Sequence, residues 1–370
     1  MKNPKFYFVS LCILLFCSST LVATPVDLFE AMSWEKVEDL NAGIKKGGNV
    51  NQIDPDYEIS ILMKAIETTK PELVKALLDA KANVNLKIPK TQKTALMHFM
   101  EKYTMVLENG TGENSEYVDD ENMLSIFKML IKAGARATDK DADGKSVLSY
   151  AIDSTYVPQS TYIMKQIIAL KADPNEMFSN DIKKSICYYV AEDSTGYKSN
   201  AFRIFLEQKL CDPNKVYKEK NQRTNTLLYI AVSKNDVELV KLLLDAGANP
   251  NIGASDTMMD YLPLFSAISN REIFTTLLKK KANPNSVEND IHIMEHAARN
   301  LPDDEEGEAL IDLLLQMGSD INHPKLFDAY TNDNKAVYAS QVVGKERLET
   351  YLVRKGALDK ERLKLKKGKK

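Results

Sequence analysis

NDVELVKLLLDAGANPN, residues 235–251, is the stretch of sequence that decides the fold. Leu239, Leu242 and Leu243 recur at helical spacing and give one apolar stripe along a helix. Gly247 follows the last helical turn, where a residue in the left-handed conformation commonly caps a C-terminus. The stretch therefore predicts an amphipathic helix that ends at a glycine cap.

The closing phrase of this stretch recurs along the whole chain. Its glycine-or-lysine position falls at 47, 81, 134, 171, 209, 247, 281, 318 and 356, mostly 34 to 38 residues apart with one step of 53. A fixed period of this length is the mark of a repeat architecture. The other copies are IKKGGNVN (44–51), KALLDAKANVN (75–85), MLIKAGA (129–135), IIALKADPN (167–175), TLLKKKANPN (276–285), LLLQMGSDIN (313–322) and YLVRKGAL (351–358).

A second phrase lies upstream of the first in five units. The copies are SILMKA (60–65), TALMHF (94–99), SVLSYA (146–151), TLLYIA (226–231) and LPLFSA (262–267). Together the two phrases resemble the ankyrin repeat, in which T-P-L-H-x-A opens a first helix and L-L-x-x-G-A closes a second. The resemblance implies an all-α repeat solenoid of helix-turn-helix units with β-turn or hairpin tips. Neighbouring units must stack to bury their apolar stripes, so a single unit is not expected to be stable outside the array.

The resemblance covers about nine units within residues 24–358, and the units depart from the family pattern in two ways. The family histidine is replaced throughout, and lysine stands at four cap positions. A non-glycine residue in the left-handed conformation lowers stability by roughly 1 kcal/mol, so the lysine caps should be less stable than the glycine caps. An acidic insertion, 101–121, interrupts the third unit and is expected to be a solvated loop, with a binding role as the alternative.

The segment DKDADGK, 139–145, spaces three carboxylates two residues apart before Gly144, as a calcium loop does. A helix-loop-helix calcium site also needs a bidentate glutamate at its twelfth position, and Tyr150 stands there. The family's turn commonly reads D-x-x-G-x before the first helix, as here. A tight turn is therefore favoured over a calcium site.

Both ends of the chain differ from its middle. Residues 1–23 combine lysines, a short apolar run and small residues, which predicts a secretory signal peptide. Lipidation of Cys17 is the less favoured alternative, because Phe16 is bulkier than the residue that a lipidation signal places there. Residues 359–370 form a basic tail. No later run reaches transmembrane length, and a net charge of −3 gives no reason to expect nucleic acid.

Cys187 and Cys211 are the two cysteines that remain after signal cleavage. Cys187 begins the first helix of the fifth unit, and Cys211 follows the second helix. Because the two helices run antiparallel, these ends lie near each other and could form a disulfide. Two buried thiols are the alternative, and the sequence slightly favours them.

An enzyme is the alternative function. His292 to His296 reads HIMEH, the zinc motif of one metallopeptidase group. The motif overlaps the first helix of the eighth unit, with His292 at the threonine position and Glu295 at the histidine position. Chance placement is favoured over zinc catalysis, and no cofactor is expected. A metal-dependent enzyme or a calcium- or zinc-binding protein on a repeat scaffold stays the alternative.

The leading interpretation is an exported, periplasmic or secreted monomer that binds an unknown protein through its repeats. In ankyrin proteins that bind through the concave face, the contacts come from turn tips before the first helix. Apolar residues at exposed tips are not required by the fold, so Met258, Met259 and Tyr261 stand out. The alternative, which the sequence slightly favours, is that the seventh tip folds onto the sixth and buries its own methionines. The positions implied are Asp56, Tyr57 and Ile59 in unit two, Ala142, Asp143 and Lys145 in unit four, Gln222, Arg223 and Asn225 in unit six, and Met258, Met259 and Tyr261 in unit seven.

Overall fold

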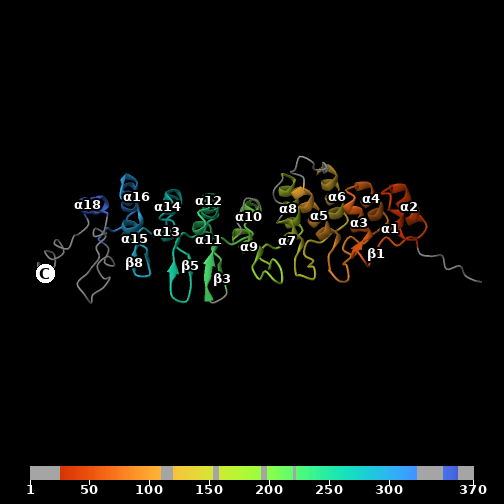
Figure 1. Cartoon of the computed structure of the whole chain (residues 1–370), viewed down its shortest axis with the longest axis horizontal. Helices are drawn as coiled ribbons and strands as arrows, with labels where there is room; N and C mark the ends of the chain where they lie inside the picture. The colour runs from red at the N-terminus through yellow and green to blue at the C-terminus, as the bar shows by residue number, and fades with distance from the viewer. Residues whose placement is uncertain are drawn as a thin grey trace, which may run out of the picture.

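The computed structural model describes residues 26–109, 120–152, 158–192, 198–219, 222–322 and 345–356. The predicted signal peptide, Cys17 and the basic tail lie outside these residues. Figure 1 shows the described residues as a long row of helix pairs, with strands and loops projecting to one side. The described part of the chain is helical, with some short strands.

In the described residues, units one to eight each contribute a first and a second helix, and the ninth contributes α18; the helices form two parallel layers. Second helices pack on the second helices of neighbouring units, as α2 does on α4 and α12 on α14. The first helices are α1 (Leu28–Ala31), α3 (Ile61–Glu67), α5 (Ala95–Asn109), α7 (Val147–Ala151), α9 (Ile186–Glu192), α11 (Leu227–Ser233), α13 (Pro263–Ser266) and α15 (Ile293–Asn300). The second helices are α2 (Val37–Lys45), α4 (Pro71–Asp79), α6 (Asp120–Lys132), α8 (Pro158–Ala169), α10 (Lys198–Glu207), α12 (Val237–Asp245), α14 (Arg271–Lys279), α16 (Glu305–Gln316) and α18 (Glu346–Arg354).

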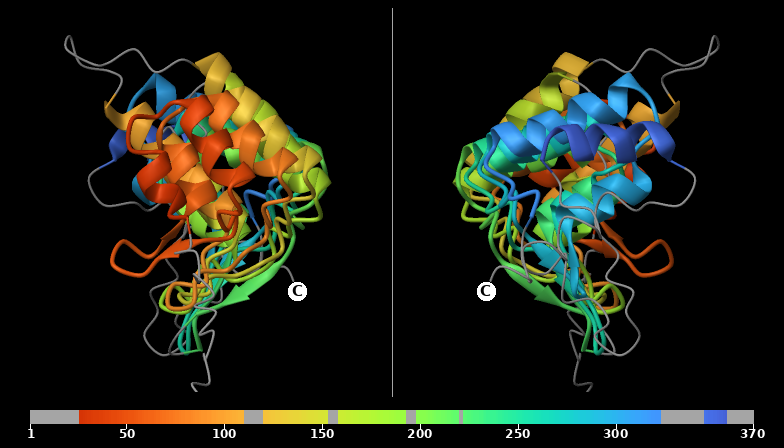
Figure 2. Two further views of the ribbon diagram at one scale, coloured as in Figure 1. Left: turned by 90° about the vertical axis from the view of Figure 1, so that its right-hand side faces the viewer. Right: turned by 90° about the vertical axis from the view of Figure 1, so that its left-hand side faces the viewer.

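The hairpins that connect units form three small antiparallel sheets within the described residues. Two sheets are single hairpins, and the third joins the hairpins of units six and seven in the order β3-β4-β5-β6. The strands are β1 (Ile53–Asp54), β2 (Ile59–Ser60), β3 (Val216–Lys218), β4 (Thr224–Thr226), β5 (Ala254–Ser255), β6 (Asp260–Tyr261), β7 (Val287–Glu288) and β8 (Ile291–His292). In Figure 2 the hairpins hang below the helices, and β1–β2 diverges from the others.

One apolar core runs the length of the array. It extends from Leu28 in α1 to Leu352 in α18, both fully buried. The leucines of the opening stretch divide as an amphipathic helix requires: Leu239 and Leu243 are buried, and Leu242 is half-buried. A single unit offers too little apolar surface to fold alone, so this shared core supplies the stability of each.

The predicted cap positions are confirmed. All nine residues, from Gly47 to Gly356, have positive φ, with 87° to 104° at the glycines and 56° to 70° at Lys81, Lys171, Lys209 and Lys281. A Cβ built on Gly247 meets nothing within 4 Å. The cost of a side chain at such a cap is therefore conformational rather than steric.

Replacing a lysine cap with glycine should stabilise the array. We expect Lys281→Gly to raise the free energy of unfolding by about 1 kcal/mol, because glycine adopts the left-handed conformation without penalty. Gly247→Lys, the matched reverse change, should lower it by about the same amount. Urea unfolding of both variants checks this. Equal stability of Lys281→Gly and the wild type would show that the cap conformation carries no strain.

Asparagine side chains bridge consecutive units. Asn251 donates from its side-chain amide to the Lys281 carbonyl at 3.2 Å and accepts from the Asn283 backbone N–H at 2.7 Å. Asn85, Asn214 and Asn285 make the same two bonds to the next unit, at 2.6 to 3.0 Å. Each of these side chains therefore satisfies the cap carbonyl of the next helix pair, a group that a helix end leaves without a helical partner.

Several first helices begin in the same way, at a residue whose side chain caps the N-terminus. The hydroxyl groups of Ser60, Ser146 and Thr226 each accept from the backbone N–H three residues on, and His292 fills the same position by accepting from the Met294 N–H at 3.1 Å through Nδ1. His292 thus performs the helix-capping role of the threonine whose position it occupies. The predicted overlap of the HIMEH motif with a first helix is confirmed.

The predicted insertion has different bounds in the structure. Residues 101–109 continue α5, and residues 120 and 121 begin α6. The prediction of a loop over all of 101–121 is wrong at both ends, because the apolar periodicity of α5 continues through Tyr103, which is buried at 1% exposure against Phe99. Residues 110–119 lie outside the described residues.

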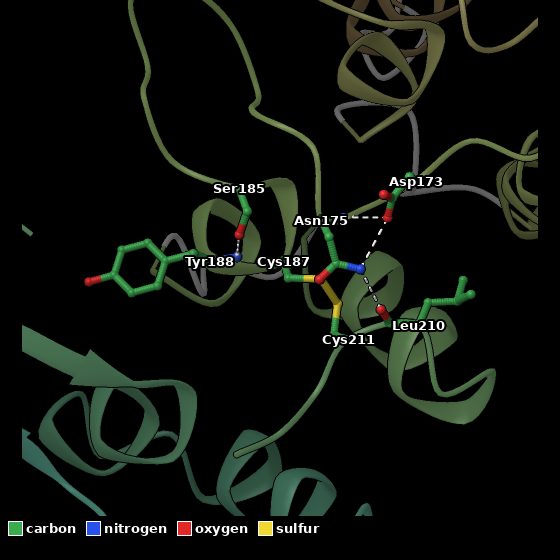
Figure 3. Close-up of a disulfide and its surroundings, with 7 residues drawn as sticks. All are labelled: Asp173, Asn175, Ser185, Cys187, Tyr188, Leu210 and Cys211. Atoms are coloured by element: carbon green, nitrogen blue, oxygen red, sulfur yellow. Dashed lines mark hydrogen bonds between the residues drawn. A yellow bond between two sulfur atoms is a disulfide. The ribbon is translucent and has the colours of Figure 1, made fainter. Parts of the chain in front are cut away.

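A disulfide joins Cys187 at the start of α9 to Cys211 beyond α10, with the Cα atoms 6.0 Å apart. Both residues are buried, so the bond lies inside the fifth unit. Figure 3 shows Asn175 beside it, with its amide group bonded to Asp173 and to the Leu210 carbonyl. The disulfide therefore fastens the two ends of the fifth helix pair at the point where the fourth unit is attached.

Thiol alkylation tests this bond in solution. Denatured, unreduced protein lacking residues 1–23 should show no labelled cysteine, and two after reduction. In the chain-entropy account, closing a loop of this length contributes about 3 kcal/mol, so Cys187→Ala with Cys211→Ala should lower the free energy of unfolding by at least that much. Two labelled cysteines without reduction would contradict the structure.

Candidate partner-binding face

The predicted contact positions lie on the hairpin side of the array, but the structure does not bring them into one patch. Asp56 and Tyr57 form the turn of the diverging β1–β2 hairpin, where Tyr57 is 78% exposed. Ile59 is half-buried in β2, and Asp143 and Lys145 belong to the tip of the fourth unit. Of the four tips that carry predicted contact positions, the sixth and seventh are joined to each other, through the pairing of β4 with β5 in the described residues.

At the sixth tip the three predicted positions differ in exposure. Gln222 and Arg223 are exposed, but Asn225 is only 9% exposed. The Asn225 side-chain oxygen accepts from the Thr226 backbone N–H at 3.1 Å, so this amide serves the fold. Arg223 is thus the candidate for contact here, and Asn225 stabilises the fold of the tip.

At the seventh tip the methionines face solvent. Met258 is 84% exposed and Met259 is 47% exposed, so this tip does not bury its own methionines. Asp256 builds the turn: its carboxylate accepts from the backbone N–H groups of both methionines at 2.9 Å and from the Tyr261 hydroxyl at 2.9 Å. These bonds lower the pKa of the Asp256 carboxyl. The turn therefore presents two apolar side chains on a fixed backbone.

Tyr261 has a supporting role. Besides its bond to Asp256, its ring packs near that of Tyr229 in α11, with the centroids 6.2 Å apart. It connects the seventh tip to the sixth unit. Of the three residues singled out there, Met258 and Met259 are the exposed pair and Tyr261 is half-buried.

A cleft of about 1260 Å³ opens between the fifth and sixth units and reaches the seventh tip. Its walls come from the loop 181–185, from α9, from β3 and from residues 256–258. Arg223 and Met258 both line it, so two of the predicted contact residues meet here. The cleft is large enough for several residues of a polypeptide, since pockets for small ligands usually measure about 300 to 1000 Å³.

Tyrosines form the base of this cleft. Tyr188 of α9 packs against Tyr217 of β3 with the ring centroids 4.7 Å apart, and the Tyr188 hydroxyl donates to the Glu219 carboxylate. Burial, together with this carboxylate, raises the pKa of Tyr188, so the hydroxyl stays protonated and remains a donor. Lys184 pairs with Glu192 and lies 5.2 Å from the centre of the Tyr188 ring. Tyr188 and Tyr217 are buried and support the cleft, whereas Tyr189 is half-buried and lines it, so Tyr189 is the tyrosine that a partner can contact.

Sequence reasoning missed Tyr188, Tyr189 and Tyr217 as residues of the face. Tyr188 stands at the position of the missing family histidine, where a buried residue is expected. The available signal was that these three tyrosines lie among the four within residues 188–217, but their approach depends on how α9 meets β3.

The segment 139–145 forms a tight turn. Gly144 has a φ of +76°, and the Asp141 carboxylate accepts from the Lys145 backbone N–H at 2.8 Å and from the Tyr150 hydroxyl at 2.6 Å. Tyr150, the residue at the twelfth position, thus stabilises the turn by donating a hydrogen bond from its hydroxyl group. Gly144 does the conformational work that the turn prediction assigns to it.

The HIMEH residues have separate partners. Glu295 is buried and pairs with Arg299 at 2.6 Å, and His296 packs on the Phe265 ring with the centroids 4.9 Å apart. Burial lowers the pKa of His296 and raises that of Glu295. Among the described residues, no three histidine, cysteine, aspartate or glutamate side chains are grouped so that they could hold a metal ion.

Comparison of the sequence with a family model and with a relative supports an ankyrin-repeat assignment. The model of the family "Ankyrin repeats (3 copies)" matches residues 187–288, from α9 to β7. An ankyrin repeat protein of fowlpox virus (strain NVSL) is 39% identical over 77 residues, which is 21% of this chain and 10% of the length of that relative. The human ASB11 ankyrin repeat domain has a TM-score of 0.44 and 18% identity, over 70% of this chain and 98% of that one.

Ankyrin repeats generally mediate contact between proteins, and no comparison indicates catalysis. In the part of the chain that the structure describes, no helix combines the length and the apolar character needed to cross a membrane.

Proposed function

We propose that this chain is an exported ankyrin solenoid, monomeric and without catalysis of its own, that binds another protein through its hairpin tips. The observation that carries the proposal is the pair of exposed methionines at the seventh tip, beside Arg223 and a tyrosine-lined cleft. Exposed apolar groups ringed by polar residues mark contact sites, and tyrosine and arginine often carry their binding energy.

Export rests on two further features. The pattern of residues 1–23 is that of a secretory signal peptide. The buried Cys187–Cys211 disulfide suits an oxidising compartment, because disulfides are rare in the cytosol. A periplasmic or secreted location is therefore part of the proposal, and the partner is a protein of that compartment.

The test is capture of the partner with variants of the seventh tip. Met258→Ser with Met259→Ser should reduce partner recovery at least tenfold, which corresponds to about 1.4 kcal/mol. The loss follows because these side chains offer exposed apolar surface to a partner. Affinity capture from the native envelope or medium, with quantitative mass spectrometry, measures it.

Met317→Ser is the matched control, because Met317 is also partly exposed but lies at the end of α16, away from the hairpin tips. Neither change should alter the melting temperature. Undiminished capture by the double variant, or equal loss with Met317→Ser, would contradict the proposed face.

A further inference from the structure

The hairpins fall into two bonded groups. In the first, the Ala142 N–H of unit four donates to the Thr91 carbonyl of unit three, and the Asn180 N–H of unit five donates to the Asp143 carbonyl. In the second, β4 of unit six pairs with β5 of unit seven. The cleft opens where these groups meet, between units five and six.

The four-stranded sheet has two edges, and among the described residues only the β6 edge is covered. At β6, the Asn289 side chain of unit eight accepts from the Asp260 N–H at 3.2 Å and donates to the Asp260 carbonyl at 3.0 Å. The Glu288 carboxylate accepts from the Leu262 N–H at 2.5 Å. These side chains replace a neighbouring strand at that edge.

The other edge, β3, faces the cleft. Lys218 is opposite Thr224 in the β3–β4 ladder, and the Glu219 N–H donates to the Arg223 carbonyl one position along. Because an antiparallel ladder alternates bonded and non-bonded pairs, the backbone N–H and C=O of Lys218 and Val216 point away from β4. Thr224, the partner of Lys218, accordingly points the other way and pairs with Ser255 of β5.

The wall opposite β3 carries no strand in the described residues. The fifth tip contributes an isolated bridge, Met177 to Ser185, and the loop 181–185 lines the cleft. Among the described residues, no backbone hydrogen bond joins that loop to Val216 or Lys218. The edge is therefore open but recessed, which admits one extended chain and obstructs the approach of a whole sheet.

The charges of the cleft are balanced. The basic residues that line it are Lys183, Lys184, Lys218 and Arg223, and the acidic ones are Asp181, Glu192, Glu219 and Asp256. A polyanion would meet as much repulsion as attraction. A row of unpaired N–H and C=O groups has its chemical complement in another extended backbone, and tyrosines and Met258 can hold its side chains.

We propose that an extended segment of the partner protein enters this cleft and adds a strand to β3. This inference rests on the proposed function, since it names how the bound protein is recognised. The partner's backbone pairs with Lys218 and Val216, and its alternate side chains contact Tyr189 and Met258 at the cleft walls.

The experiment uses a displayed library of random twelve-residue peptides and the chain from residue 24 onward. Peptides enriched on the wild type are synthesised, and their affinities are measured for Lys218→Pro and for its matched control Lys218→Ala. Proline removes the outward N–H without removing a bond to β4. We expect at least tenfold weaker binding to Lys218→Pro and less than threefold weaker binding to Lys218→Ala.

Hydrogen exchange on the wild type gives a readout independent of any variant's folding. A bound peptide should slow exchange at the Lys218 amide at least tenfold. The inference is overturned if no peptide is enriched, if Lys218→Pro binds as tightly as Lys218→Ala, or if the Lys218 amide gains no protection. Concentration-dependent dimerisation that Lys218→Pro abolishes would also overturn it, because the occupant would then be a second copy.

Failure here is distinguishable from failure of the proposed function. If Lys218→Pro captures the native partner normally while the double methionine variant does not, the hairpin tips bind a protein without strand addition.

Discussion

The asparagine bridge between consecutive units is the interaction on which the rest of the structure depends. A short helix pair leaves its last carbonyl groups without helical partners and its apolar stripe exposed. The side chain of Asn251 bonds both the carbonyl of the next cap and an N–H two residues further on. The bridge therefore fixes the register in which neighbouring stripes meet, and the continuous core follows from that register.

The fifth unit shows what a local change in this pattern does. Asn175 bonds the carbonyl of Leu210, one residue beyond the positive-φ Lys209, whereas Asn214 and Asn251 bond the positive-φ residue itself. Cys211 then stands at the position of the buried cap alanines, and its disulfide fastens the unit. The hairpin stack is interrupted at the following junction, where the cleft opens. The candidate binding surface thus lies beside a unit that departs from the repeat pattern.

Much of the fold could be predicted from the sequence because it is set locally. The cap at Gly247, the start of a first helix at TLLYIA and the helix spacing are properties of a few neighbouring residues, and the structure agrees with each. Residues 101–109 are predicted to be a loop, because their acidic, loop-like composition outweighs a weak continuation of the helical pattern, but they are helical.

The candidate site could be predicted only in part. The exposure of Met258 and Met259 follows from apolar residues standing at turn positions. The burial of Asn225 and the meeting of Tyr188 with Tyr217 depend on how two units pack, which no single repeat specifies. The open edge of β3 likewise depends on a strand that the neighbouring unit does not supply.

The most direct test of this account is amide hydrogen exchange at Asn283 in Asn251→Ala, with Asn300→Ala as the control. Asn300 is exposed on α15, and among the described residues its side chain bonds to His296 of its own unit. Losing the bridge leaves the Asn283 N–H without its acceptor, and hydrogen bonds of this kind contribute about 0.5 to 1.5 kcal/mol each. The account predicts faster exchange at Asn283 and a free energy of unfolding lowered by roughly 1 to 3 kcal/mol in Asn251→Ala alone. Equal effects from the two variants would contradict it.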